Sequence, residues 1–127
     1  MFDGSSLSYE GNLGTTRLLI RIAKAAGVNV EAELGRIGGA EDSGKGGTSR
    51  KEDYTDPDQA VEFVRETGID ALAISIGNTH GFYQRKAELD FDLLERIRST
   101  VKVPLVLHGG TGIPDEYFVR AIRLGIS

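Results

Sequence analysis

The strongest constraint on the fold is the alternation of strand-like and helix-like segments along 127 residues. Such alternation is typical of βα units built on a parallel sheet. The predicted helices cover residues 12–26, 58–67, 91–101 and 114–124, and the predicted strands cover residues 28–34, 71–77 and 104–107. A complete (β/α)8 barrel needs about 250 residues. We therefore expect an α/β fold, a partial TIM (β/α)8 barrel of about three to four βα units that forms a single domain, truncated at both ends.

Capping residues mark the ends of the predicted helices. Apolar residues at helical spacing, Leu18 and Ile22 among them, predict the buried face of the first helix, and Gly27 predicts its end. Asp56 and Asp90 precede the second and third helices, where an aspartate side chain can accept hydrogen bonds from unpaired backbone N–H groups.

Acidic residues interrupt the strand expected over residues 28–34. Val28 and every second residue after it fall on one face, while Glu31 and Glu33 fall on the other. In a barrel this second face is interior, where ionised carboxylates are costly unless they are paired or bound to a metal. We expect no basic partner on the neighbouring strands, so Glu33, nearer the end of its strand, is a candidate neighbour of a metal. Small residues such as Ala73 on the next strand suit a crowded interior.

The chain has two histidines, and each is followed by glycine at the end of a predicted strand. These are His80 with Gly81 and His108 with Gly109. Parallel strands gather their ligand-binding residues at their carboxyl ends. Without cysteine, a transition metal must be held by histidine and carboxylate, so the pair indicates a zinc site that needs a third protein ligand. The alternative is that each histidine is a separate, satisfied polar residue.

The glycine-rich turn after His108 is a candidate phosphate site. Gly109, Gly110 and Thr111 lie just before the helix expected from residue 114. Backbone N–H groups and a hydroxyl in such a turn can hold a phosphate at a helix N-terminus. The alternative is a plain turn, since glycine is common where strands end.

A segment rich in glycine, serine and charge runs over residues 35–56, longer than loops in compact domains normally are. We expect it to be a mobile active-site loop. Glu41 and Asp42 lie within it. An acidic loop can simply be solvated, but a loop that closes can also deliver a general acid or base.

Composition excludes several functional classes. The net charge of −4 argues against general affinity for nucleic acid, which is bound mainly through clustered Lys and Arg. No apolar run approaches the roughly 20 residues of a membrane-spanning helix. The N-terminus lacks the basic and apolar pattern of a signal peptide. We expect a cytoplasmic protein.

Several motifs, in this order along the chain, resemble the class II, metal-dependent fructose- and tagatose-bisphosphate aldolases. The similar segments are residues 1–5, 31–35, 38–42, 54–57, 77–81 and 104–114. The resemblance covers essentially the whole chain and corresponds to the C-terminal half of the family's barrel. It implies reversible cleavage of fructose 1,6-bisphosphate to dihydroxyacetone phosphate and glyceraldehyde 3-phosphate. Zinc polarises the ketone in this family, so the reaction needs no lysine Schiff base.

The resemblance also implies roles for acidic residues and histidines. His80 and His108 match two of the family's three zinc-binding histidines. Glu33 matches a glutamate near the metal, and Glu41 matches the acidic residue of the mobile loop that takes part in proton transfer. These two glutamates are therefore the candidate catalytic residues.

The same resemblance implies a substrate site. Gly81, Gly109, Gly110 and Thr111 match positions that contact dihydroxyacetone phosphate. Carbonyl groups of nearby glycines bind a monovalent cation, Na⁺ or K⁺, in the family. The expected partners are a sugar bisphosphate and either further copies of the chain or a chain that supplies the missing half of the barrel.

The sequence departs from the family at catalytic positions. The third zinc histidine follows a catalytic aspartate in the family, and no Asp-His pair occurs here. The family's asparagine-rich phosphate segment would follow the last residue. Gln84 and Arg85 stand where some members carry a phosphate-binding lysine. We expect little turnover from this chain alone.

Three alternatives stay open from the sequence. The chain can be a tagatose-bisphosphate aldolase, because nothing in the sequence distinguishes two substrates that differ in stereochemistry at one carbon. It can be a non-catalytic half-barrel that binds phosphate or metal and associates with another chain. It can also be an unrelated phosphate-binding barrel that uses no metal.

Overall fold

The computed structural model describes residues 1–39, 50–81, 83 and 87–127. Strands and helices alternate along it as expected, with one additional short 3-10 helix, η1. In chain order the elements are α1 (Tyr9–Ala25), β1 (Glu31–Leu34), η1 (Lys51–Asp53), α2 (Pro57–Thr67), β2 (Ala71–Ile74), α3 (Phe91–Thr100), β3 (Leu105–Val106) and α4 (Asp115–Arg123). None of the helices in this part of the chain is long and apolar enough to cross a membrane.

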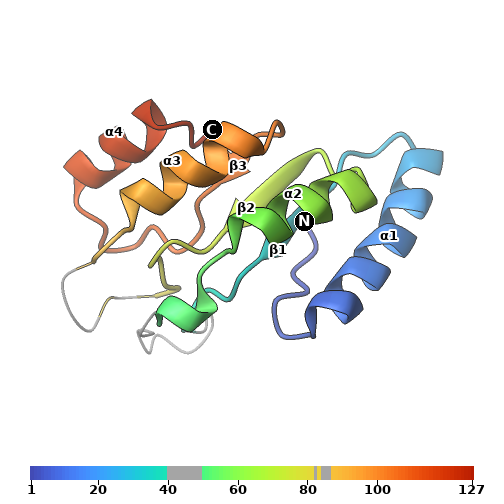
Figure 1. The fold of residues 1–127 in the computed structure, drawn as a ribbon, viewed down its shortest axis with the longest axis horizontal. Helices are drawn as coiled ribbons and strands as arrows, with labels where there is room; N and C mark the ends of the chain where they lie inside the picture. Colours follow the sequence, from blue (N-terminus) through green and yellow to red (C-terminus); the bar gives the residue numbers. More distant parts are fainter. Residues whose placement is uncertain (40–49, 82, 84–86) are drawn as a thin grey trace.

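The three strands form one parallel sheet in the order β1-β2-β3. Parallel bridges extend this order at both edges, because Phe2 pairs with Ala32 of β1 and Ile126 pairs with Leu105 of β3. Helices α1 to α4 follow one another along one side of the sheet in the same sequence (Figure 1). Each βα unit therefore lies beside the unit before it, which is the arrangement of a (β/α)8 barrel. The predicted partial barrel is confirmed.

The hydrophobic core lies between the sheet and the helices. Leu72 and Ile74 of β2 are fully buried on this side, as are Phe63 of α2 and Leu94 of α3. Residues alternate along each strand, so Glu31 and Glu33 of β1 and the alanines of β2 face the opposite, barrel-interior side. Because the apolar strand residues pack against the helices, the alternate residues of each strand face the barrel interior.

The predicted caps agree with the structure, although α1 begins at Tyr9, three residues earlier than expected. Asp56 caps α2 by accepting hydrogen bonds from the N–H groups of Asp58 and Gln59 at 3.0 and 2.9 Å. Asp90 caps α3 by accepting from the N–H group of Leu93 at 2.9 Å. Gly27 follows α1 with a φ of 67°, a left-handed conformation that favours glycine.

The predicted buried face of α1 was wrong for two of its apolar residues. Leu18 and Ile22 are 57% and 60% exposed, whereas Asn12, Thr16 and Ile20 are buried. The Asn12 side-chain amide donates a hydrogen bond to the Glu33 carbonyl at 2.9 Å and accepts one from the Thr16 hydroxyl at 3.2 Å. A polar contact with the strand therefore orients this helix, and hydrophobic periodicity cannot report such a contact.

All three predicted strands proved shorter than expected, and β3 covers only two of its four predicted residues. The β1 ladder begins at Glu31, and Val28, placed in the strand by its alternation pattern, is 56% exposed. The β2 ladder ends at Ile74 because Thr55 inserts after it. The Thr55 hydroxyl donates to the Leu34 carbonyl at 2.6 Å and accepts from the Ser75 N–H group at 2.8 Å. One side chain thus replaces direct pairing of the strand ends.

Replacement of Asp56 by alanine tests the cap of α2. We expect Asp56→Ala to lower the free energy of unfolding by about 1 kcal/mol, because two backbone N–H groups lose their acceptor. Asp58→Ala is the matched control: this exposed aspartate lies in the same first turn but its side chain does not cap the helix. Urea unfolding of the two variants measures the difference. Equal losses would contradict a specific role for the cap.

Candidate active site

The two histidines come together at the carboxyl ends of the adjacent strands β2 and β3. The ring centroids of His80 and His108 are 6.2 Å apart, with an interplanar angle of 82°. The N–H group of His80 donates to the Gly38 carbonyl at 2.7 Å, and this contact ties the His80 turn to the segment after β1. Gly81 follows with a φ of 74°. The expected proximity of the histidines is therefore observed.

The turns that carry the histidines approach each other at Gly109. This residue has a φ of 70°, and a Cβ atom built there would lie 2.2 Å from the Thr79 carbonyl oxygen. Real Cβ atoms do not come so close to a backbone oxygen. A glycine at this position lets the His108 turn lie directly against the His80 turn.

Glu31 contacts His108, although 77 residues separate them in the sequence. The distance from Glu31 Oε1 to His108 Nε2 is 2.7 Å, and both side chains are partly buried. The expectation that the interior strands offer no basic partner was therefore wrong for Glu31. In the register of the sheet, β2 separates the two and faces the interior with Ala71 and Ala73. Small residues on the intervening strand leave room for this contact.

Glu33 is the most buried carboxylate in the described part of the chain, with 1% exposure. Burial and the negative charge of Asp3 raise its pKa to about 7, while His108 and a hydrogen bond from Ser5 act in the opposite direction. Its Oε2 atom has no hydrogen-bond partner among the described residues. A carboxyl group in these surroundings changes its protonation state near neutral pH.

Asn78 is a site residue that the sequence analysis missed. It is 0% exposed and donates to the carbonyls of Ile74 and His108, both at 3.1 Å. Its side-chain oxygen accepts from the N–H group of Ile76 at 2.8 Å. The available signal was an asparagine directly after an apolar strand, where a buried amide must find partners.

The glycine turn after His108 leads into α4 as predicted. A Cβ atom on Gly110 would lie 2.9 Å from the ring of Phe118, so this glycine is packed against the helix. Thr111 is exposed. Asp115 and Glu116 occupy the first turn of α4, and their charges oppose an anion at this helix N-terminus. A phosphate here would depend on the backbone N–H groups of the turn.

Several predicted residues lie outside the described part of the chain. These are Glu41 and Asp42 in the expected loop, and Gln84 and Arg85 after the first histidine. Within the described ranges, no group of three or more histidine, aspartate and glutamate side chains could hold a metal ion. A metal ion held by the two histidines would therefore need a further ligand from outside the described residues.

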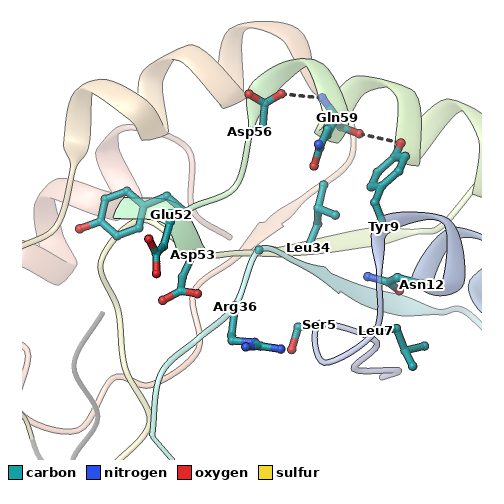
Figure 2. A pocket seen from close by; sticks show the side chains of 12 residues that line it. Ser5, Leu7, Tyr9, Asn12, Leu34, Arg36, Glu52, Asp53, Asp56 and Gln59 are labelled. Carbon is teal, nitrogen blue, oxygen red and sulfur yellow. Dashed lines mark hydrogen bonds between the residues drawn. The ribbon is translucent and has the colours of Figure 1, made fainter. Parts of the chain in front are cut away.

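A separate pocket of about 240 Å³ lies beside the end of β1 (Figure 2). Its lining includes Ser5, Asn12, Arg36 and Asp53, whereas neither histidine contributes to it. Arg36 and Ser5 both project into this region (Figure 2). Through Ser5, which hydrogen-bonds Glu33, the pocket adjoins the carboxylates of the barrel interior.

Comparisons with known proteins agree on one family. The family described as "Fructose-bisphosphate aldolase class-II" matches residues 1–127. A fructose-bisphosphate aldolase from Geobacillus stearothermophilus is 46% identical over 129 residues, which cover 100% of this chain and 43% of that protein.

Solved structures give the same result. The YdjI aldolase from Escherichia coli superposes with a TM-score of 0.82 at 42% identity, covering 98% of this chain and 41% of that one. A fructose-bisphosphate aldolase from Campylobacter jejuni superposes with a TM-score of 0.74 at 28% identity, covering 98% and 37%. The chain thus spans less than half the length of each of these relatives.

Replacement of Glu33 by glutamine tests its protonation. A carboxyl with a pKa raised to about 7 binds a proton more tightly in the folded chain than in the unfolded one. Its contribution to stability is therefore present below about pH 4.5 and is lost as pH rises through 7. We expect Glu33→Gln to unfold with up to about 3 kcal/mol more stability than wild type at pH 8, and without this pH dependence.

The exposed Glu95→Gln variant is the control for this measurement and should follow wild type throughout. Urea unfolding from pH 4 to 8 gives the comparison. A parallel decline of Glu33→Gln and wild type would show that Glu33 does not titrate in this range.

Proposed function

Because the chain belongs to the class II fructose-bisphosphate aldolase family, we propose that it forms part of an enzyme that cleaves fructose 1,6-bisphosphate reversibly to dihydroxyacetone phosphate and glyceraldehyde 3-phosphate. The observation that carries this proposal is the pairing of His80 with His108 at the carboxyl ends of adjacent strands, with Glu31 bound to one of them. That edge of a barrel is where catalytic residues gather.

We propose zinc as the metal held by His80 and His108. The ring centroids of the two histidines lie 6.2 Å apart, so that both imidazoles could hold the same ion. When bound, zinc would polarise the ketone of the substrate. The described residues provide no third ligand beside the two histidines, and we propose that the missing half of the barrel supplies it.

Glu31 supports this role for His108. A carboxylate next to Nε2 favours the tautomer in which Nε2 carries the proton, so Nδ1 presents its lone pair. This arrangement also orients the ring and makes the imidazole a stronger ligand. In the proposed site, Glu31 therefore acts through His108 and does not bind the metal.

Glu33 and Glu41 are the proposed groups for proton transfer. A general acid or base works best when its pKa lies near the working pH, and the raised pKa of Glu33, about 7, meets this condition. The proposal for Glu41 comes from its motif alone, on the segment 35–56 that we propose closes over the site.

The proposed substrate site comprises Gly81, Gly109, Gly110 and Thr111. Backbone N–H groups can approach a phosphate closely where glycine has no side chain. Gly81 and Gly109 have positive φ angles in turns that follow the histidines, which supports this role. We further propose that glycine carbonyls nearby bind a monovalent cation, Na⁺ or K⁺.

We propose a cytoplasmic protein whose 127 residues form one partial barrel domain. We also propose that its activity requires the other half of the barrel, in a homo-oligomer or in association with another chain. The exposed apolar residues of the outer helices favour such association. Leu18 and Ile22 of α1, and Val119 and Ile122 of α4, are 48–61% exposed. The same observation supports the second candidate, a non-catalytic half-barrel that binds phosphate or metal.

Metal titration tests the role of the histidines. We expect Zn²⁺ binding to the wild-type chain to weaken at least about tenfold in His80→Ala and in His108→Ala, because each variant removes one of two ligands. Isothermal titration calorimetry measures the affinity, and Asp58→Ala serves as a variant that leaves the site intact. Equal affinity in both histidine variants and wild type would exclude this metal site.

A chimera tests the proposed activity. The chain replaces the 129 matching residues of the Geobacillus stearothermophilus relative, which restores a full-length barrel. We expect this chimera to cleave fructose 1,6-bisphosphate in a coupled assay with Zn²⁺, and the 127-residue chain alone to show little turnover. His108→Ala in the chimera should lower kcat by several orders of magnitude.

Tagatose 1,6-bisphosphate is assayed in parallel. Faster cleavage of this sugar would identify the chain with a tagatose-bisphosphate aldolase. A folded chimera that cleaves neither sugar would favour the non-catalytic half-barrel.

A further inference from the structure

Tyr83 joins the two turns that carry the histidines. Its hydroxyl accepts a hydrogen bond from the Thr79 N–H group at 3.0 Å and donates one to the Gly109 carbonyl at 3.2 Å. Thr79 immediately precedes His80, and Gly109 immediately follows His108. A single side-chain oxygen thus links the backbone beside one histidine to the backbone beside the other.

The ring of Tyr83 packs against the same turn. A Cβ atom built on Gly112 would lie 3.4 Å from the Tyr83 Cδ2 atom, so the ring lies against the glycine turn that follows His108. The side chain is half-buried, and burial raises the pKa of its hydroxyl. The hydroxyl therefore stays neutral at neutral pH, so it can donate and accept at the same time.

A second hydrogen bond joins the two turns at the peptide group next to the one that Tyr83 contacts. Asn78 donates to the His108 carbonyl at 3.1 Å, whereas Tyr83 donates to the next carbonyl, that of Gly109. Both donors belong to the segment around His80. Two consecutive carbonyls are thus held by donors from the segment after β2, and the peptide plane after His108 has a defined orientation.

We infer that Tyr83 is a positioning residue that sets the separation and orientation of His80 and His108. Gly109 permits the close approach of the two turns, and the Tyr83 hydroxyl holds them in that approach. Without the hydroxyl, the Thr79 N–H group and the Gly109 carbonyl lose a partner, and the Asn78 side chain is left to hold the two turns together. The expected effect on metal affinity rests on the proposed function. The positioning of the two histidines by Tyr83 does not.

The Tyr83→Phe variant tests the inference because it removes the hydroxyl and keeps the ring. Tyr9→Phe is the matched control: the Tyr9 hydroxyl donates to Glu62 at 3.0 Å between α1 and α2, away from the histidines. Each variant removes a tyrosine hydroxyl that makes two hydrogen bonds, so both should lose some stability. The histidines should respond only to the first.

Nitrogen-15 NMR of the imidazoles gives the decisive signal without metal, since the chain has two histidines. We expect both imidazole signals to shift in Tyr83→Phe, and the Thr79 amide to exchange roughly tenfold faster. Neither should change in Tyr9→Phe. Unchanged imidazole signals in a folded Tyr83→Phe chain would overturn the inference.

Zn²⁺ titration then measures the functional consequence. We expect Tyr83→Phe to bind Zn²⁺ roughly tenfold more weakly than wild type and Tyr9→Phe to bind with wild-type affinity. A wild-type chain that binds no Zn²⁺ contradicts the proposed function, and the imidazole comparison alone then decides the role of Tyr83.

Discussion

Parallel pairing of the strands in chain order is the constraint on which the site depends. It brings the ends of β1, β2 and β3 to the same edge of the sheet, where residues far apart in sequence meet. The apolar residues of the strands face the helices, so the barrel interior receives only the residues left over. These residues are two glutamates and several small residues, and they lie next to the turns that carry the two histidines. The chemistry of the site is thus a consequence of how the core divides the strand faces.

The two glutamates that face the barrel interior are stabilised to different extents. Glu31 has His108 as a close partner, whereas one oxygen of Glu33 has none among the described residues. Burial without full compensation disfavours the charged form of Glu33 and raises its pKa to about 7. Two carboxylates on one strand face therefore behave differently: Glu31 contacts an imidazole, and Glu33 has a pKa near neutral pH. Their environments, and not their residue type, make this difference.

Local signals and topology made much of this structure predictable. Caps such as Asp56 act within a few residues, and parallel order alone implies that His80 and His108 meet. The remaining features depend on contacts between distant residues. The buried face of α1 follows from a hydrogen bond between Asn12 and a strand carbonyl, and the partner of Glu31 lies 77 residues away. No periodicity encodes such pairs, since either partner looks ordinary in its own segment.

Gly109 has a consequence for how this site can vary. The close approach of the two histidine turns is possible only where backbone meets backbone, since even a methyl group at Gly109 would collide with the Thr79 carbonyl. Interior side chains that do not join the two turns, unlike those of Asn78 and Tyr83, can therefore change size or charge without altering that approach. A substitution at Gly109 would instead move both turns together with the histidines they carry. Substitutions elsewhere in the interior can thus change ligand preference while the separation of the two turns stays the same.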